Sequence, residues 1–286
     1  MRVTDIIKGE KPSLSFEVFP PKTQDIFDSV KDTALKIAAL KPSYMSVTYG
    51  AGGGTSQFTA DISEAISKSG VTSLSHLSCI SSTKEKVKEQ VEMLKGKGIE
   101  NILALRGDIP NGMSMEKLDY HYASELIEDI KKYGDFCIGG ACYPETHPDS
   151  ASAAEDIENL KKKVDAGCEF LVTQMFFSND ILYNFMYRLL KAGIDVPVVP
   201  GIMPITNAKQ IATAAKLSNS FVPQSFLRLV DRYGSNPAVM RQAGIAFATE
   251  QIIDLYANGF NAVHIYTMNK PDVAEAIMNN VSEIIK

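Results

Sequence analysis

The chain has 286 residues, 45% of them hydrophobic and 22% charged, a composition that excludes a disordered or fibrous protein. Its formal net charge of −5, without a basic block, disfavours binding to nucleic acid. No apolar run approaches the roughly 20 residues that span a membrane, and the charged segment MRVTDIIKGE is unlike a secretory signal. Cys79, Cys137, Cys142 and Cys168 form no C-x-x-C pair, which indicates reduced thiols and a cytoplasmic protein.

Short apolar, β-branched or aromatic runs recur along the chain, and an amphipathic segment follows most of them. The expected strands are Leu14–Phe19, Tyr44–Tyr49, Ser73–Cys79, Asn101–Leu105, Phe136–Tyr143, Phe170–Phe176, Val196–Pro200 and Ala262–Thr267. The expected helices are Ile26–Leu40, Thr59–Ser69, Lys84–Gly96, Tyr120–Tyr133, Ala153–Ala166, Ile181–Ala192, Asn207–Leu217, Pro223–Tyr233 and Asn236–Asn258. Several helices stop at a glycine, the usual C-cap residue, namely Gly70, Gly98, Gly134, Gly167 and Gly193.

This alternation predicts an α/β fold. Eight strands that alternate with helices favour a closed (βα)8 TIM barrel, with extra helices between strands seven and eight. An open, doubly wound parallel sheet is the alternative. No linker or break in composition suggests a second domain, so we expect residues 1–286 to form a single barrel domain without a regulatory domain.

Functional groups of such barrels lie at the carboxyl ends of the strands. Polar residues gather there, among them Glu17, His76, Arg106-Gly107-Asp108 and Gln174. Burying a carboxylate is costly unless it is used, which favours Glu17 as a general acid. Plainer interpretations are a Glu17–lysine pair, a core histidine, a local salt bridge between Arg106 and Asp108, and a backbone hydrogen bond from Gln174.

Other site types are less well supported. Gly50–Gly54 is either a phosphate cradle or a tight turn, and it matches neither the P-loop nor the G-x-G-x-x-G pattern. The four histidines are dispersed, without metal-ligand spacing, and no G-x-S-x-G elbow is present. The residues alone therefore indicate a barrel enzyme with a carboxylic acid in one polar pocket, without naming its reaction.

Several segments at the strand ends, taken in chain order, resemble the methylenetetrahydrofolate reductase family. They are SFEVFPPK (15–22), SVTYGAGG (46–53), HLSC (76–79), ILALRGD (102–108), CYPETHP (142–148), NLKKKVDAG (159–167), TQMFF (173–177), PGIMPITN (200–207) and IYTMNK (265–270). The resemblance covers nearly the whole chain and implies the barrel fold expected above.

The resemblance also implies an activity in one-carbon metabolism and methionine biosynthesis. The family reduces 5,10-methylenetetrahydrofolate to 5-methyltetrahydrofolate with non-covalent FAD, usually with NADH or NADPH as the electron donor. We therefore expect a flavoprotein oxidoreductase that binds small-molecule substrates, does not bind nucleic acid or membranes, and forms a homo-oligomer.

Family positions carry residue roles over to this chain. Glu17 and Asp108 match catalytic residues, as the general acid and as a carboxylate that stabilises a cationic folate intermediate. Asp108, Gln174, Gln210 and Lys270 match substrate contacts. The positions that match FAD contacts are Thr48, His76, Arg106, Gly107, Asp108, Tyr122, Ala123, Tyr143, His147, Asp156, Asn159, Lys162 and Lys163.

The chain departs from the family pattern at two positions. Ala214 replaces a phenylalanine that stacks on both the nicotinamide nucleotide and the folate, and Lys270 replaces an arginine. Lysine keeps the charge but loses the bidentate fork. Two alternatives stay open: a flavin-binding subunit that receives electrons from a partner protein, for which Ala214 is the main support, and a flavin-free barrel aldolase or pterin transferase.

Overall fold

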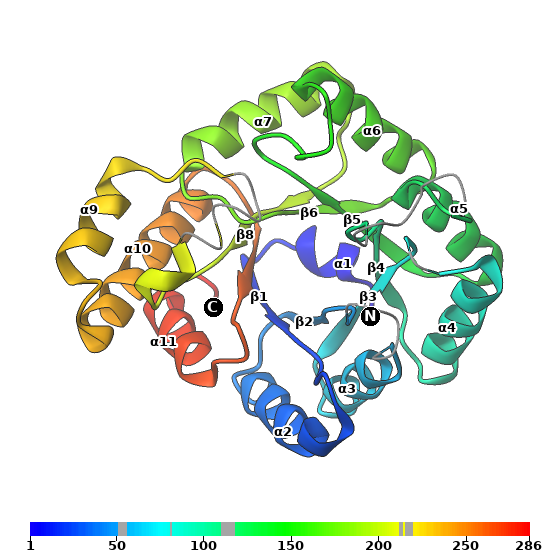
Figure 1. The fold of residues 1–286 in the computed structure, drawn as a ribbon, viewed down its shortest axis with the longest axis horizontal. Coiled ribbons are helices and arrows are strands. Elements are labelled where there is room, and N and C mark those ends of the chain that lie inside the picture. Colours follow the sequence, from blue (N-terminus) through cyan, green and yellow to red (C-terminus); the bar gives the residue numbers. More distant parts are fainter. Residues whose placement is uncertain (51–55, 81, 110–117, 212–213, 215–219) are drawn as a thin grey trace.

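The computed structural model describes residues 1–50, 56–80, 82–109, 118–211, 214 and 220–286. Its strands pair in parallel and lie inside a ring of helices (Figure 1). The strands are β1 (Ser13–Val18), β2 (Tyr44–Val47), β3 (Thr72–Ser78), β4 (Asn101–Leu105), β5 (Cys137–Cys142), β6 (Phe170–Thr173), β7 (Val198–Val199), β8 (Gly201–Ile202) and β9 (Ala262–Tyr266).

The sheet comes round into a nearly closed barrel at Pro200. The strand order is β7-β6-β5-β4-β3-β2-β1-β9-β8, and only Pro200 separates the two end strands in the chain. Val199 pairs with β6, whereas Gly201 pairs with β9. Proline has no backbone N–H to donate, so Pro200 interrupts the ladder at the end of the strand predicted at Val196–Pro200, and β8 lies beyond the predicted strand. The predicted α/β barrel is confirmed.

Helices surround the strands. They are α1 (Val3–Ile7), α2 (Phe27–Ala38), α3 (Ser56–Lys68), α4 (Lys84–Gly96), α5 (Ala123–Tyr133), α6 (Ala153–Asp165), α7 (Asn179–Lys191), α9 (Gln224–Tyr233), α10 (Pro237–Ala257) and α11 (Pro271–Val281), with a 3-10 turn, η1, at Gln24–Ile26. The extra helices predicted before the last strand are α9 and α10. Of the helix predicted at Asn207–Leu217, residues 208–211 and 214 are helical and Asn207 lies in a bend. The remaining residues of that range lie outside the described residues, as does most of Gly50–Gly54.

Local predictions were wrong at several helix ends. α5 begins at Ala123 rather than Tyr120, because Tyr122 is extended (φ −138°) and the Glu125 carboxylate accepts hydrogen bonds from the backbone N–H groups of His121 (2.6 Å) and Tyr122 (3.1 Å). Gly134 is extended (φ 172°) instead of forming a left-handed cap, whereas the other glycines expected to cap helices have positive φ.

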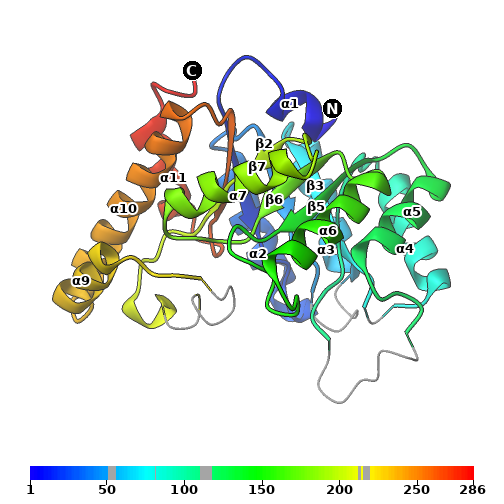
Figure 2. The same cartoon turned by 90° about the horizontal axis from the view of Figure 1, so that it is seen from above.

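The short helix α1, which the sequence analysis missed, closes the amino end of the barrel (Figure 2). Its Val3 and Ile7 join an apolar cluster inside the barrel with residues such as Leu74 and Phe170. The Asn101 side chain accepts a hydrogen bond from the backbone N–H of Val3 at 2.8 Å. A larger cluster packs the outer face of the strands against the helices. Because one end is plugged, the other end is left for a ligand.

The described residues also limit other kinds of site. All four cysteines are free and buried. No helix in this part of the chain combines the length and apolar character needed to cross a bilayer. Within the same residues, no group of histidine, cysteine and carboxylate side chains is arranged to hold a metal ion.

Candidate active site

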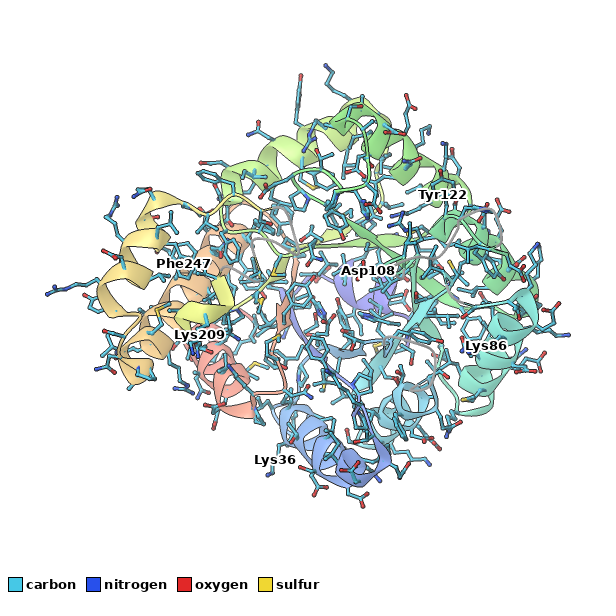
Figure 3. All side chains as sticks on the ribbon, in the orientation of Figure 1. Lys36, Lys86, Asp108, Tyr122, Lys209 and Phe247 are labelled. Atoms are coloured by element: carbon cyan, nitrogen blue, oxygen red, sulfur yellow. The ribbon has the colours of Figure 1, made fainter. Side chains whose placement is uncertain are left out.

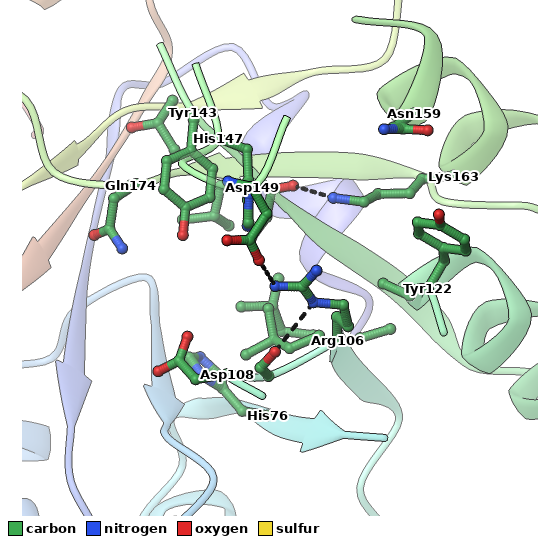
Figure 4. Close-up of a pocket in the computed structure, with 18 of the residues that line it drawn as sticks. His76, Arg106, Asp108, Tyr122, Tyr143, His147, Asp149, Asn159, Lys163 and Gln174 are labelled. Carbon is green, nitrogen blue, oxygen red and sulfur yellow. Dashed lines mark hydrogen bonds and ion pairs between the residues drawn. The ribbon is translucent and has the colours of Figure 1, made fainter. Parts of the chain in front are cut away.

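A cavity of about 460 Å³ lies at the carboxyl ends of the strands (Figure 4), and Asp108, one of its lining residues, lies near the middle of the view in Figure 3. The two predicted catalytic residues, Glu17 and Asp108, both line it. Every residue predicted to contact FAD lines it too, namely Thr48, His76, Arg106, Gly107, Asp108, Tyr122, Ala123, Tyr143, His147, Asp156, Asn159, Lys162 and Lys163. The fold thus gathers into one cavity residues that lie far apart in the sequence, while their individual roles stay predictions.

Glu17 lies at the floor of the cavity, near the end of β1, and is only 6% exposed. Its Oε2 atom accepts a hydrogen bond from Ser46 Oγ (3.4 Å) and lies 3.5 Å from His76 Nε2 and 3.6 Å from His264 Nε2. None of these neighbours is a lysine or an arginine, so the plain interpretation of a Glu17–lysine pair is not what holds this carboxyl group.

His76, on β3, is a neutral neighbour of Glu17 at neutral pH. Burial lowers the pKa of His76 to about 4, and the attraction of Glu17 opposes that shift only in part. A neutral imidazole does not compensate the charge of a carboxylate. His76 therefore places no positive charge beside Glu17 at neutral pH.

The turn after β4 separates Arg106 from Asp108. The Arg106 guanidinium pairs with Asp149 and donates through Nε to the carbonyl of Gly107 (3.2 Å), as Figure 4 shows, so the local Arg106–Asp108 salt bridge does not form. Gly107 has φ +87°, and a Cβ there would lie 2.2 Å from Ser78 Oγ, so only glycine fits. Asp108 is exposed and forms no ion pair within the described residues, which leaves its carboxylate facing the cavity.

The loop after β5 forms a second wall of the cavity. The rings of Tyr143 and His147 meet edge to face, with centroids 4.6 Å apart. Asp156 Oδ2 accepts a hydrogen bond from the backbone N–H of His147 at 3.1 Å, so this carboxylate fixes the loop. Burial lowers the pKa of His147, and Arg106 adds to that effect. The Tyr143 ring and the Asp156 carboxylate thus fix the position of His147 in this wall.

Helix α6 brings two cations to the cavity. Lys163 Nζ donates to the carbonyl of Ala141 at 2.8 Å, and burial lowers the pKa of this lysine. Lys162 is exposed and donates to Asn159 Oδ1 at 3.2 Å. Tyr122 stands at the start of the neighbouring helix α5, with 53% of its surface exposed, and lies on the same side of the cavity as Lys163 (Figure 4). An exposed aromatic ring near two ammonium groups suits a ligand with a flat ring and an anionic part.

The predicted substrate contacts divide into two sets. Gln174 lines the cavity, and its Oε1 accepts from the backbone N–H of Met175 at 2.9 Å, the backbone bond that was the plainer interpretation. Gln210 and Lys270 do not line this cavity. They meet instead at Thr206, whose backbone N–H donates to Gln210 Oε1 (3.1 Å) and whose hydroxyl accepts from Lys270 Nζ (2.8 Å).

Sequence reasoning gave no role to several lining residues, among them Tyr49, Asp149 and Tyr266, although Tyr49 and Tyr266 lie at predicted strand ends. Tyr266 ends β9, and its hydroxyl donates to the carbonyl of Thr173 at 2.5 Å. A Cβ on Gly201 would lie 2.5 Å from that hydroxyl, so glycine at this position makes room for the tyrosine. The strand-end position of Tyr266 was a signal that could have found it.

A parallel α/β barrel with a polar cavity at the carboxyl ends of its strands defines the class of barrel enzymes. The family model for methylenetetrahydrofolate reductase matches residues 2–282. Over 270 residues, the chain is 35% identical to 5,10-methylenetetrahydrofolate reductase of Pectobacterium carotovorum subsp. carotovorum and 34% identical to that of Escherichia coli (strain K12), covering 94% of this chain and 90% of each relative. The chain belongs to the methylenetetrahydrofolate reductase family.

A plant relative and two solved structures also match the chain. The chain is 35% identical over 303 residues to methylenetetrahydrofolate reductase (NADH) 1 of Arabidopsis thaliana, a match that covers 99% of this chain and 51% of the plant protein. An uncharacterized protein from Clostridium thermocellum that binds two copies of 5-methyl-5,6,7,8-tetrahydrofolic acid superposes with a TM-score of 0.65 over 99% of this chain and 100% of that one, at 12% identity. Xanthomonas albilineans dihydropteroate synthase superposes with a TM-score of 0.52 over 96% of this chain and 92% of that one, at 13% identity. Both likenesses concern the fold alone.

Proposed function

We propose that this chain reduces 5,10-methylenetetrahydrofolate to 5-methyltetrahydrofolate, with FAD as cofactor and NADH or NADPH as electron donor. Membership of the family supports the folate chemistry. The observation that carries the proposal is one cavity with two carboxyl groups in contrasting surroundings, Glu17 buried at the floor and Asp108 exposed. Two carboxyl groups in different surroundings can take different roles, here Glu17 as a proton donor and Asp108 as a fixed negative charge.

The cavity fits FAD in its chemistry. Its lining includes residues of the barrel floor, such as Glu17, and residues of α6, such as Lys163, so one ligand could reach both. Lys162 and Lys163 would hold the diphosphate, and Tyr122 and Tyr143 would flank aromatic rings. When bound, FAD would supply the chemistry of hydride transfer between the nicotinamide donor and the folate.

Glu17 would act as the general acid. Its proton goes to N10 of the folate, so that the five-membered ring opens to a cationic iminium at N5. His76 is neutral at the pH of the reaction, because burial lowers its pKa to about 4, so it does not hold Glu17 in the charged form. The buried position keeps bulk water from taking the proton.

Asp108 would stabilise the cation that this step creates. Its carboxylate faces the cavity without an ion-pair partner among the described residues, since Arg106 is engaged by Asp149. A fixed negative charge beside a developing positive charge lowers the barrier. Gln174 would hydrogen-bond the pterin, and Gln210 and Lys270, joined at Thr206, would bind a part of the folate beyond the cavity.

The test begins with the visible absorption spectrum of the purified protein, followed by anaerobic additions of NADH and NADPH in turn. We expect oxidised flavin bands that one nucleotide bleaches and that methylenetetrahydrofolate restores. A protein without flavin absorption even after added FAD would contradict the proposal and favour a flavin-free barrel.

A second candidate is a flavin-binding subunit that receives electrons from a partner protein. Its support is Ala214, which is buried in an apolar cluster with Met175, Phe177 and Phe226, so position 214 offers no aromatic ring to a nucleotide. Flavin that neither nucleotide reduces, in a protein that methylenetetrahydrofolate still reoxidises, would favour this candidate.

A further inference from the structure

A chain of buried polar groups runs below the cavity from β1 across β9 to β2. Ser15 Oγ lies 2.7 Å from His264 Nδ1, and His264 Nε2 lies 3.0 Å from Ser46 Oγ. Ser46 in turn reaches Glu17 Oε2 at 3.4 Å. His264 and both serines are at most 1% exposed. These hydrogen-bonded groups therefore connect Glu17 to a histidine that the proposed reaction does not otherwise use.

The register of the strands builds this chain. Ser15 and Glu17 are two residues apart on β1, so their side chains lie on the same face of the strand. Ser15 pairs with His264 of β9, and Glu17 pairs with Ser46 of β2. The His264 ring also stacks on Tyr44 with centroids 5.8 Å apart. The imidazole is thus held at a fixed place between the two serines.

When Glu17 is a carboxylate, the hydrogen bonds can all run toward it. Ser15 donates to His264 Nδ1, the Nε2–H of His264 donates to Ser46, and Ser46 donates to Glu17 Oε2. Each donor in this chain has an acceptor, and the imidazole is neutral.

When Glu17 is protonated, the hydrogen bonds between the same groups can all point away from it. Glu17 donates to Ser46, Ser46 donates to Nε2, and the Nδ1–H donates to Ser15. Ser15 then donates to the backbone carbonyl of Val263, which its Oγ approaches at 3.2 Å. His264 carries one proton in either direction, so the two arrangements differ only by the proton on Glu17.

We propose that His264 is a positioning residue that holds Glu17 in both protonation states by exchanging its tautomer between Ser15 and Ser46. This inference rests on the proposed role of Glu17 as general acid. A residue that can only donate or only accept would favour one state of Glu17, whereas an acid that must give up a proton and regain it in each turnover needs both.

Other titratable groups near Glu17 do not replace this function. His76 on β3 lies 3.5 Å away but forms no hydrogen bond through Nε2 among the described residues. Burial raises the pKa of Tyr44 on β2 and of Tyr266 on β9 above the ordinary value for tyrosine, and the negative charge of Glu17 adds to that effect. These phenols and the neutral His76 keep one charge state around pH 7, so Ser46 and His264 are the groups able to respond.

The first test replaces His264 by phenylalanine, which keeps a ring against Tyr44. In His264→Phe, the Ser46 hydroxyl loses the imidazole that accepts its hydrogen bond when Glu17 is protonated. When Glu17 is a carboxylate, Ser46 can still donate to it. A buried donor without an acceptor penalises the acid form. We expect the alkaline limb of the rate of folate reduction, measured with pre-reduced flavin, to move roughly one pH unit lower.

Ser15→Ala provides a second and smaller change. It removes the acceptor of the Nδ1–H, so we expect a shift in the same direction. Ser13→Ala is the matched control, because Ser13 lies on the same face of β1 and, among the described residues, its hydroxyl donates to the carbonyl of Asn261 (3.2 Å) rather than to His264. Its pH profile is expected to equal that of the native chain. An unshifted limb in both His264→Phe and Ser15→Ala, with flavin bound, would overturn the inference.

A direct readout needs no turnover. The chain has four histidines, so nitrogen-15 NMR of histidine-labelled protein, assigned through His264→Phe, can follow the tautomer of His264 with pH. We expect the proton to move from Nδ1 to Nε2 as Glu17 loses its proton, and one tautomer throughout would contradict the inference. Loss of flavin binding or of folate reduction in the native chain would instead contradict the proposed function, so the two failures are distinguishable.

Discussion

The floor and the rim of the cavity are built by different physical means. At the floor, Glu17, His76 and His264 are buried on β1, β3 and β9 and are fixed by the register of the sheet. At the rim, Arg106 and Lys162 come from a turn and a helix surface, and their partners, Asp149 and Asn159, lie beside solvent. We therefore expect the floor to set the chemistry, through protonation, and the rim to set binding.

The largest expected effect is on the floor. Glu17→Gln keeps the shape of the side chain but removes the acidic proton, so folate reduction is expected to fall by on the order of 1,000-fold. Flavin content and the rate of flavin reduction by the nicotinamide donor should equal those of the native chain, as rapid-mixing absorbance would show. Loss of the flavin instead would mean that Glu17 has a structural role.

Asp108→Asn tests the exposed carboxylate. Folate reduction should slow by on the order of 100-fold, because the cationic intermediate loses its counter-charge while solvent still screens part of the loss. The measurement is the single-turnover rate of reoxidation of reduced flavin by methylenetetrahydrofolate. An unchanged rate would remove Asp108 from the chemical step.

The folded chain should lose stability at acid pH because of His76. Its pKa of about 4 in the folded chain lies below the ordinary value of 6.5, so the unfolded state binds the proton more readily as the pH falls below 6.5. The free energy of unfolding should fall by about 2 kcal/mol between pH 7 and pH 5 from this residue. Urea unfolding of the native chain and of His76→Gln at both pH values measures the difference, and equal losses in the two proteins would contradict it.

The smallest effect is expected at the rim. The Arg106–Asp149 pair is partly exposed, with side chains 19% and 54% accessible, so Asp149→Asn should cost at most about 1 kcal/mol of unfolding free energy. Flavin affinity should change more than stability, since Arg106 becomes free to move. Equilibrium dialysis and urea unfolding separate the two effects. A large loss of stability would show that the rim is as tightly built as the floor.

The same contrast separates what the sequence could predict from what it could not. Alternating apolar strands and amphipathic helices have local periodicity, and they led to the barrel and to Glu17, His76 and Asp108 at its strand ends. The single-turn helix α1 has no periodicity to detect, and α11 was missed although Pro271 marks its start. The chain through Ser15, His264 and Ser46 joins residues more than 200 positions apart, so it depends on the strand register alone.

The most direct test of the central claim omits the nicotinamide donor. Flavin in the purified protein is reduced chemically under anaerobic conditions, and 5,10-methylenetetrahydrofolate is then added while the visible spectrum and the folate products are followed. The account predicts that the oxidised flavin bands return with one 5-methyltetrahydrofolate formed per flavin. Reduced flavin that persists in the presence of the folate would contradict it.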